Sequence, residues 1–358
     1  MRVVFRVDAS YEVGSGHLMR CLTLAKRFIK EKKADVYFIM RALDGNLINL
    51  VEQEGIHSLI LPKADKVYHL EGYSKWLTVS QVLDAEQSIK KIEFIDSVDL
   101  LVVDSYAIDI TWECMLRPYT KKIMVIDDLA NRKHDCDILL DQNLYDDMYK
   151  RYNGLIPSDC ECFLGPLFVL LRDEFYIARE KLSRKRSELR NILVFFGGID
   201  ASNETTKTLQ AIDKLNKPNL IVNVVVGKNN PYKEEVANYC AMHDNWNYYC
   251  QINNMAELMV DADLAIGAGG TTTWERCFLN LPSIVITVAD NQVEGAMVSS
   301  KEGIIKYLGL SRNVNVESIT QAISTLSLNE IELMSKRCNY LMDDGGQIYE
   351  MLEICCTY

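Results

Sequence analysis

The stretch Val3-Val-Phe-Arg-Val-Asp-Ala-Ser-Tyr-Glu-Val-Gly-Ser-Gly-His17 predicts the fold of this chain. Residues 3–7 are apolar or β-branched apart from one arginine, as in a buried strand, and the glycines that follow mark a tight turn. Apolar side chains then recur at helical spacing, at Leu18, Cys21, Leu22, Leu24, Ala25 and Phe28. Strand, turn and helix in this order indicate the first unit of a parallel α/β sheet.

Similar apolar runs recur at residues 36–40, 100–103, 123–126, 192–196, 221–226, 264–266 and 283–288. Segments with helical spacing separate them, which is typical of parallel sheets covered by helices on both faces. The alternation restarts near residue 190, after a basic stretch at 181–190 that we interpret as a solvated helix end and linker. We therefore predict an α/β fold with two Rossmann-like doubly wound domains, residues 1–185 and 186–340, facing across a ligand-binding cleft.

The composition is that of a globular protein without nucleic-acid partners. Of 358 residues, 48% are hydrophobic, and 39 Lys and Arg oppose 50 Asp and Glu, for a formal net charge of -11. An acidic chain lacks the basic surface that binds nucleic acid. No apolar run reaches the roughly 18–20 residues of a membrane span, and charges at positions 2, 6 and 8 exclude a signal-peptide core. We expect a cytoplasmic protein without stable membrane association.

The 11 cysteines do not have the spacing of a metal site. No C-x-x-C motif occurs, and the only close pairs are Cys160-Glu-Cys162 and Cys355-Cys356. In a reducing compartment such cysteines act mostly as small buried hydrophobes. We therefore expect no bound metal.

The glycine-rich turn after the first predicted strand carries a candidate catalytic base. Gly14 and Gly16 let the backbone turn tightly, and His17 then lies near a helix N-terminus, where the helix dipole favours the neutral imidazole. A neutral imidazole accepts a proton near pH 7, and Asp8 can orient the ring or deliver a water. The alternative is a histidine that only caps the helix. The pattern is not G-x-G-x-x-G, because position 19 is Met, so a dinucleotide site has little support.

Two glycine loops in the second half follow predicted strands and open helices. The first, Phe196-Gly197-Gly198-Ile-Asp200-Ala-Ser202-Asn203, exposes backbone amides to a phosphate, although Ser202 or Asn203 equally suits a helix N-cap. The second adds hydroxyl groups that can donate to a diphosphate, at Gly270, Thr271, Thr272 and Thr273. Glu275 can accept from ribose hydroxyls, or form a capping box with Thr272. Neither loop is a Walker motif.

Other polar residues follow predicted strands, where ligands bind in such sheets. Asn291 and Gln292 suit sugar or amide recognition, and equally an ordinary helix start. Tyr106 offers a ring and a hydroxyl to a sugar. Asp127 and Asp128 have the chemistry of metal ligands, but adjacent residues at a strand end face opposite ways, which favours a turn role for at least one.

Taken together, the motifs resemble those of the UDP-2,4-diacetamido-2,4,6-trideoxy-β-L-altropyranose hydrolases of pseudaminic acid biosynthesis. The resemblance covers about residues 1–300 and rests on Arg6-x-Asp8-Ala-Ser-x-x-x-Gly14-x-Gly16-His17-x-x-Arg20, Val103-Asp-Ser-Tyr106, Asp127-Asp128, Cys136-Asp-Ile-Leu-Leu-Asp-Gln-Asn143, Leu164-Gly-Pro-x-x-x-x-Leu171-Arg172-x-Glu-Phe175, Gly197-Gly198-x-Asp200 and Asp290-Asn291-Gln292. This family is similar to the UDP-N-acetylglucosamine transferase of peptidoglycan synthesis, with the same glycosyltransferase-B architecture.

The resemblance implies hydrolysis of a UDP-linked sugar, with water attacking the anomeric carbon, UDP leaving, and neither metal nor other cofactor. It implies His17 as base or water-positioning residue, and Tyr106 and Asn291 in the sugar pocket. Asp8 and Arg20 share the opening motif, so Asp8 joins the candidate catalytic set. The product would serve flagellin glycosylation.

The second domain is implied to bind UDP. Residues 270–273 would hold the diphosphate, Glu275 the ribose, and the backbone of Ile252 the uracil ring. The expected substrate-binding set is completed by Gly14, Gly16 and Arg20 of the first domain and by Gly197, Gly198, Asp200 and Gln292 of the second. The chain departs from the family at Ile199, where Ser or Thr is usual, so one hydroxyl donor is missing.

In this fold a C-terminal helix often returns to the first domain, and the apolar spacing of Ile348, Met351, Leu352 and Cys355 within residues 341–358 permits this. Related spore-coat polysaccharide proteins share the motifs. The alternatives are therefore a glycosyltransferase with a UDP-sugar donor, in surface or spore-coat polysaccharide synthesis, and a non-catalytic UDP-sugar-binding module.

Overall fold

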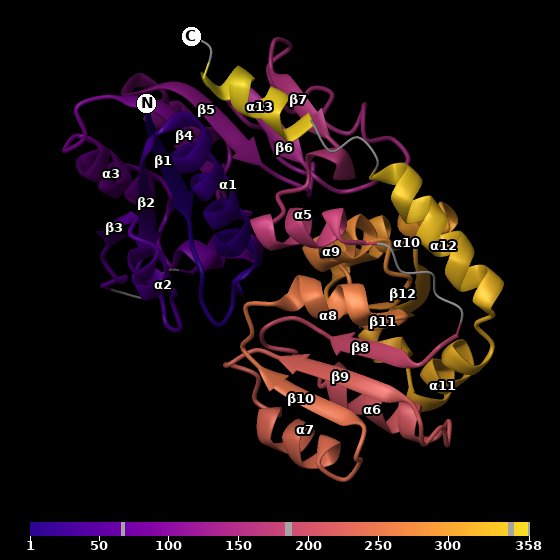
Figure 1. The fold of residues 1–358 in the computed structure, drawn as a ribbon. Coiled ribbons are helices and arrows are strands. Elements are labelled where there is room, and N and C mark those ends of the chain that lie inside the picture. Colours follow the sequence, from indigo (N-terminus) through magenta and orange to yellow (C-terminus); the bar gives the residue numbers. More distant parts are fainter. Residues whose placement is uncertain (66–68, 183–187, 343–346, 357–358) are drawn as a thin grey trace. The chain divides into compact units, whose positions relative to one another are not determined.

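Parallel sheets form in both halves of the chain, as the sequence predicts (Figure 1). The computed structural model describes residues 1–65, 69–182, 188–342 and 347–356. The chain divides into two compact units. The first unit holds Met1–Gln142, Asp147–Leu170 and Gly346–Tyr358, and the second holds Asn143–Asp146 and Leu171–Gly345.

The first unit has a seven-stranded parallel sheet in the order β3-β2-β1-β4-β5-β6-β7. Its strands are β1 (Arg2–Val7), β2 (Asp35–Arg41), β3 (His57–Leu61), β4 (Val98–Asp104), β5 (Thr120–Ile126), β6 (Ile138–Asp141) and β7 (Glu161–Leu164). Its helices are α1 (Gly16–Lys32), α2 (Ile48–Gln53), α3 (Gln81–Ile92), α4 (Ile110–Leu116) and α13 (Gln347–Cys356), with 3-10 turns η1 (Gly72–Leu77), η2 (Arg117–Tyr119) and η3 (Pro166–Phe168). The predicted apolar stripe of α1 is buried in the core that covers β1 and β2.

The second unit repeats the arrangement with six parallel strands in the order β10-β9-β8-β11-β12-β13. They are β8 (Asn191–Phe195), β9 (Ile221–Val226), β10 (Trp246–Cys250), β11 (Leu264–Ala268), β12 (Ser283–Thr287) and β13 (Lys306–Leu310). The helices are α5 (Asp173–Glu180), α6 (Glu204–Asp213), α7 (Lys233–Cys240), α8 (Met255–Asp261), α9 (Thr271–Phe278), α10 (Val293–Lys301), α11 (Val316–Ser324) and α12 (Leu328–Leu341), with 3-10 turns η4 (Asp290–Gln292) and η5 (Ser311–Asn313).

The last helix, α13, packs on the first unit, although it follows the second unit in sequence (Figure 1, yellow). Ile348, Met351, Leu352 and Cys355 are buried in the same apolar core as α1. The Sγ of Cys355 lies 4.0 Å from the Sδ of Met124 in β5. The apolar spacing noted in the sequence is thus the face that enters this core.

The boundary expected between residues 185 and 186 lies outside the described residues, as do residues 343–346 and 357–358 of the predicted C-terminal segment. Of the described elements, α5 counts with the second unit, as does the short segment Asn143–Asp146. Among the helices that the structure describes, none combines the length and the apolar character needed to cross a membrane.

Candidate active site

The two sheets each reverse their strand order at one place, and loops carrying the candidate residues lie there. In the first unit β1 pairs with both β2 and β4, and in the second β8 pairs with both β9 and β11. At such a point the connections after the two neighbouring strands run to opposite faces of the sheet. A crevice opens between them at the carboxyl ends of the strands, where ligands bind. The loops after β1 and β4 bring His17 and Tyr106 to this edge.

His17 is held by a buried aspartate from the neighbouring strand. Its Nδ1 lies 2.6 Å from Oδ1 of Asp104, the last residue of β4, and the Asp104 side chain is 0% exposed. Burial alone raises the pKa of Asp104, but Arg20 and His17 outweigh it and hold that pKa well below its ordinary value. Asp104 is therefore an anion, and a contact this short with an anion places the proton on Nδ1. The neutral ring then has Nε2 as its proton acceptor.

Arg20 joins Asp104 to a second carboxylate. Its Nε and Nη2 donate to the two Asp104 oxygens at 2.6 and 2.7 Å, a bidentate pair. Its Nη1 lies 3.4 Å from Oδ2 of Asp128, and the Tyr106 hydroxyl donates to the other oxygen of Asp128. Burial raises the pKa of the Tyr106 hydroxyl well above its ordinary value, with Asp128 adding to the effect. The ring centroids of Tyr106 and His17 are 4.6 Å apart.

Asp8 does not orient His17, contrary to the expectation from the sequence. One of its oxygens pairs with Arg6 Nη1 at 2.7 Å, and the other accepts from the Arg41 amide at 2.7 Å. Arg6 and Arg41 also bind Asp84, which is fully buried. Asp8 thus belongs to a buried ion network, because its side chain leaves β1 on the side of Arg6 and Arg41.

Asp104 is the residue that sequence reasoning missed. In the sequence it appears only as the second residue of the strand-end motif Val103-Asp-Ser-Tyr106. The available signal is an aspartate that directly follows the apolar run at residues 100–103, since such a carboxylate needs a buried partner. Which residue binds His17 depends on the pairing of β1 with β4, and the sequence does not show that pairing.

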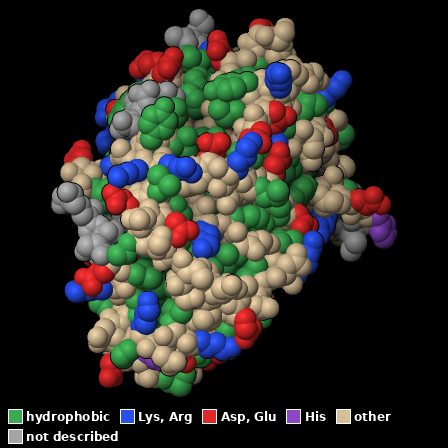
Figure 2. All heavy atoms as spheres, turned by 90° about the vertical axis from the view of Figure 1, so that its right-hand side faces the viewer, with side chains coloured by type: hydrophobic (Ala, Val, Ile, Leu, Met, Phe, Trp, Pro, Cys, Tyr) green, Lys and Arg blue, Asp and Glu red, His purple; other side chains and the backbone are tan. Residues whose placement is uncertain are grey.

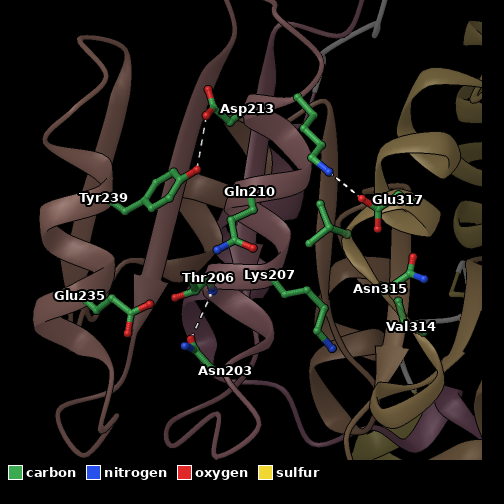
Figure 3. A pocket seen from close by; sticks show the side chains of 12 residues that line it. Asn203, Thr206, Lys207, Gln210, Asp213, Glu235, Tyr239, Val314, Asn315 and Glu317 are labelled. Carbon is green, nitrogen blue, oxygen red and sulfur yellow. Dashed lines mark hydrogen bonds and ion pairs between the residues drawn. The ribbon is translucent and has the colours of Figure 1, made fainter.

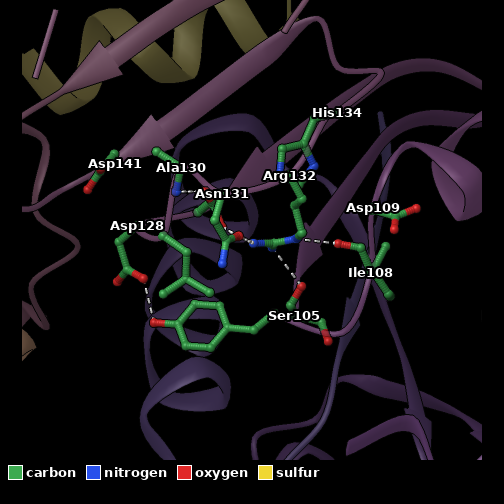
Figure 4. Close-up of polar contacts among 12 residues, drawn as sticks. Ser105, Ile108, Asp109, Asp128, Ala130, Asn131, Arg132, His134 and Asp141 are labelled. Carbon is green, nitrogen blue, oxygen red and sulfur yellow. Dashed lines mark hydrogen bonds and ion pairs between the residues drawn. The ribbon is translucent and has the colours of Figure 1, made fainter. Parts of the chain in front are cut away.

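Asp127 and Asp128 diverge, as adjacent strand-end residues do. Asp127 accepts the Ala130 amide at 2.9 Å and pairs with Arg132 at 2.7 Å, which is a turn role. Arg132 also donates to the Ser105 carbonyl at 3.1 Å, so it ties the loop after β4 to the loop after β5 (Figure 4). The described ranges contain no group of three or more His, Cys, Asp or Glu placed to hold a metal ion.

The glycine turn before His17 is closed by its own backbone. The Gly14 amide donates to the Ser10 carbonyl at 2.9 Å, and Gly14 adopts φ +79°, which glycine accepts without strain. Gly16 is the first residue of α1 and His17 the second. Because the His17 ring is bound to Asp104, His17 does not act merely as a helix cap.

In the second unit, the N-terminus of α9 follows a glycine loop and is not capped by a side chain in the described residues. Gly270 is its N-cap with φ +84°. Thr272 lies inside the helix, so the alternative capping box with Glu275 does not form. The amides at such an end and the helix dipole both favour a negative group.

Gln292 packs against the same glycines. It belongs to η4 after β12, its Oε1 accepts the Val288 amide at 3.0 Å, and a Cβ built on Gly269 would lie 3.3 Å from it. The loops after β11 and β12 therefore meet at Gly269 and Gly270. Asn291, beside Gln292 in the same turn, is exposed.

Glu275 is a half-buried carboxyl in the first turns of α9, with a side chain that is 16% exposed. Its Oε1 lies 3.7 Å from Nη2 of Arg172, and that arginine also pairs with Glu174 at 2.7 Å. Burial raises the pKa of Glu275 to about 7, and Arg172 opposes the shift. The carboxyl thus changes charge near neutral pH.

The other glycine loop does not offer a free helix end, which corrects the expected role of Asp200. The Asp200 carboxylate accepts the Glu204 and Thr205 amides at 2.9 Å each, and Asn203 accepts the Thr206 amide. The chain's own carboxylate thus occupies the position a phosphate would take, and Asn203 is the N-cap that the alternative foresaw. Gly197 and Gly198 lie in the turn just before it.

The remaining predicted residue, Ile252, lies between β10 and α8, at the edge where the other loops of this sheet end. It is half-buried and follows Gln251, which adopts φ +56°. The structure thus gathers Gly270, Thr271–Thr273, Glu275 and Gln292 around α9. Ile252 occupies a separate loop of the same edge.

A separate pocket of about 680 Å³ lies between α6, α7 and α11 of the second unit (Figure 3). Charged groups at its wall are paired, with Lys214 at 2.6 Å from Glu317. The Tyr239 hydroxyl points to Asp213 in the figure and donates to it at 3.4 Å. None of the residues expected to bind substrate is among those that line it.

Comparison with known proteins gives both a family profile and curated relatives. The Glycosyltransferase family 28 C-terminal domain matches residues 191–340. An uncharacterized protein of Methanocaldococcus jannaschii is 30% identical over 293 residues, which cover 80% of this chain and 55% of that protein. The chain therefore spans about half the length of this relative.

Two relatives of matching length carry functional names. The UDP-2,4-diacetamido-2,4,6-trideoxy-beta-L-altropyranose hydrolase of Campylobacter jejuni is 28% identical, covering 85% of this chain and 97% of that protein. The spore coat polysaccharide biosynthesis protein SpsG of Bacillus subtilis is 24% identical, covering 91% of this chain and 89% of that protein.

Solved structures share the fold at low identity. Acinetobacter baumannii MurG has a TM-score of 0.65 at 13% identity, covering 99% of this chain and 98% of that one. UDP-GlcNAc 2-epimerase from Neisseria meningitidis has a TM-score of 0.59 at 12% identity, covering 99% of each chain. The two α/β domains are thus of the glycosyltransferase-B type, and the resemblance to the altropyranose hydrolases that the motifs predicted is confirmed.

Proposed function

We propose that this chain, with its glycosyltransferase-B fold and its similarity to a UDP-sugar hydrolase, hydrolyses a UDP-linked diacetamido-trideoxyhexose to UDP and the free sugar. The observation that carries the proposal is the contact of 2.6 Å between His17 and the buried Asp104. A neutral imidazole with its Nδ1 proton committed to an anion is a proton acceptor at Nε2, as water activation requires. The name of the C. jejuni relative supports the sugar.

The chemistry in the first unit is a single displacement. Water bonds to the anomeric carbon through its oxygen, and a proton of that water passes to Nε2 of His17. The bond between the anomeric carbon and the diphosphate oxygen breaks, and its electron pair leaves with UDP. Asp104 stabilises the imidazolium that forms, while the charge of Arg20 keeps Asp104 ionised. Tyr106 serves as a sugar-pocket residue of this unit.

The chemistry in the second unit is nucleotide binding. The N-terminus of α9, with Gly270 and Thr271–Thr273, holds the diphosphate. Glu275 accepts from the ribose hydroxyls when ionised, and the backbone at Ile252 reads the uracil ring. Because these donors belong to the backbone and to neutral hydroxyls, they bind an anion although the net charge is -11.

The proposal is tested with His17→Phe, assayed against a panel of UDP-diacetamido-trideoxyhexoses by NMR of the anomeric protons. The variant should lose turnover by at least about 100-fold, the scale of general-base catalysis, and keep its affinity for UDP. His57→Phe, at an exposed histidine in β3, is the matched control and should behave as wild type. Unchanged turnover in His17→Phe would contradict the role of His17.

A second candidate is a glycosyltransferase with a UDP-sugar donor. The observation that favours it is the match to the family 28 C-terminal domain, together with the similarity to a spore-coat polysaccharide protein. UDP release that requires an added acceptor would favour this function, and release with water alone favours hydrolysis. Calorimetric binding of the UDP sugar without any product would indicate a non-catalytic binding module.

A further inference from the structure

Three aromatic side chains gather beside the His17 imidazole in the first unit. Tyr106 lies 4.6 Å from it between ring centroids, and Trp76 lies 5.9 Å from it. Trp76 stacks on Tyr106 at 5.4 Å, and Tyr73 meets both rings, at 4.8 Å from Trp76 and 5.1 Å from Tyr106. These rings come from segments far apart in sequence, so the fold has assembled them next to the proposed base.

The segment that supplies Tyr73 and Trp76 is η1, and it is held against the glycine turn. Leu77 is buried in the core beneath it, and Trp76 packs against the same core. Lys75 pairs with Glu12 of the turn at 2.7 Å. This anchoring fixes where the rings lie, because the segment is pinned both by burial and by the ion pair.

The rings of Tyr73 and Trp76 are only half-buried, whereas Tyr106 is 7% exposed. The Tyr106 hydroxyl is already bonded to Asp128. The half-buried rings of η1 thus add aromatic carbon surface next to His17 and Tyr106. A site that binds sugars needs such surface where carbon-bound hydrogens and methyl groups of the ligand lie.

We propose that Tyr73 and Trp76 form the apolar wall of the sugar site and select a 6-deoxy, N-acetylated hexose over its 6-hydroxy analogue. The inference rests on the proposed function of the same site. A methyl group at C6 gains contact with the rings, whereas a hydroxymethyl group brings a hydroxyl that loses its water hydrogen bonds there. Apolar pockets reject an added hydroxyl by about 10–100-fold, which sets the size of the expected selectivity.

The test compares kcat/KM for a UDP-2,4-diacetamido-2,4,6-trideoxyhexose and for the same compound with a 6-hydroxyl. Wild type should prefer the deoxy sugar by about 10–100-fold, and Trp76→Ala should reduce this preference to about threefold or less. Affinity for UDP should not change. Trp246→Ala, at a half-buried tryptophan of β10 in the second unit, is the matched control and should keep the wild-type preference.

Tyr73→Ala provides a second variant if Trp76→Ala proves misfolded by circular dichroism. Tyr73→Ala should likewise lower the preference for the 6-deoxy sugar. A preference unchanged in the folded variants would overturn the proposal, because the rings would then play no part in recognising C6.

Saturation-transfer NMR separates this inference from the hydrolase proposal. In wild type, saturation of the protein's aromatic protons should reach the C6 methyl protons of the bound UDP sugar, and the transfer should fall sharply in Trp76→Ala. Saturation transfer to the methyl protons without release of UDP would support the apolar wall and contradict the hydrolase proposal. Two results would overturn the proposal of an apolar wall. One is release of UDP without saturation transfer to that methyl group, and the other is the absence of UDP-sugar binding by wild type.

Discussion

Asp8 directly follows β1 and Asp104 ends β4, which pairs with β1, and the partners of the two carboxylates give them different roles. The side chain of Asp8 is neutralised by Arg6, which is itself buried. Asp104 instead bridges Arg20 and His17. Its lowered pKa keeps it ionised through the neutral range, so any titration of activity near pH 7 must come from another group.

Asp104→Asn should lower kcat by at least about 100-fold, because an amide no longer holds the Nδ1 proton of His17 by charge. It should also move the ¹⁵N shifts of His17 away from the Nδ1–H form, a change that a merely structural role would not produce. Asp96→Asn, at an exposed aspartate, is the control and should leave both readouts unchanged. Wild-type ¹⁵N shifts in Asp104→Asn would contradict the assignment.

Glu275 allows a prediction on stability because burial raises its pKa from 4.5 to about 7. The folded state keeps the proton to higher pH than the unfolded state, so the free energy of unfolding falls as pH rises from 4.5 to about 7. This difference in pKa corresponds to a fall in the free energy of unfolding of about 3 kcal/mol at most. Glu275→Gln, which cannot ionise, should therefore be more stable than wild type at pH 8 and similar to it at pH 4.5.

Urea unfolding at the two pH values measures this difference, with exposed Glu234→Gln as the control. The gain in stability should come with weaker binding of UDP at pH 8, because the amide is uncharged and has one accepting oxygen where the carboxylate proposed to bind the ribose has two. An identical pH dependence in wild type and Glu275→Gln would show that another group controls it.

At the scale of elements, the strands foreseen from apolar runs are those in the middle of the sheets. β1, β4, β8 and β11 are covered on both faces and read as continuous apolar stretches. The edge strand β10 is half-exposed along its length and mixes Trp, Asn and Tyr, so its sequence lacks that signal. For this reason β10 is absent from the strands predicted from apolar runs.

The helices α6 and α9 begin after similar glycine loops, but their N-termini should differ in function. Asp200→Ala removes the carboxylate that accepts the first two amides of α6 and should cost about 1 kcal/mol of stability without changing UDP affinity. Gly270→Ala should weaken UDP binding, because φ +84° disfavours a side chain at the helix end that is proposed to hold the diphosphate. Isothermal titration measures the affinity of both variants for UDP. Weaker binding in Asp200→Ala with unchanged binding in Gly270→Ala would indicate that the diphosphate binds at α6 instead.

The helix α13 should stabilise the first unit. Leu352 is 0% exposed in the core, so Leu352→Ala should cost about 2–5 kcal/mol. Glu350→Ala, on the exposed side of the same helix, should be nearly neutral. Urea unfolding followed by tryptophan fluorescence checks both variants, and equal midpoints would mean that α13 contributes no packing energy.

At the scale of the whole molecule, acidic side chains outnumber basic ones. Figure 2 shows Lys and Arg side chains intermixed with Asp and Glu on the face drawn, and the net charge is -11. A net negative charge does not attract an anion over long range, so the proposed binding of UDP relies on local amides and hydroxyls.

Raising the salt concentration from about 20 to 200 mM should therefore leave the association rate of UDP unchanged or increase it slightly, since salt screens the repulsion from the net charge. Stopped-flow measurement of UDP binding checks this expectation. A fall of about tenfold, as for ligands steered by a basic patch, would contradict it.

The sequence by itself determined the order of strands, turns and helices, and placed His17, Tyr106 and the α9 glycines at strand ends. Those features are local, because side-chain periodicity and glycine depend on neighbours in the chain. Tertiary structure alone decided that Asp104, 87 residues from His17, orients it while Asp8 does not. It also brought Trp76 beside that ring. The physical reason is the strand order, which sets β4 against β1 and so decides which distant side chains share one buried edge.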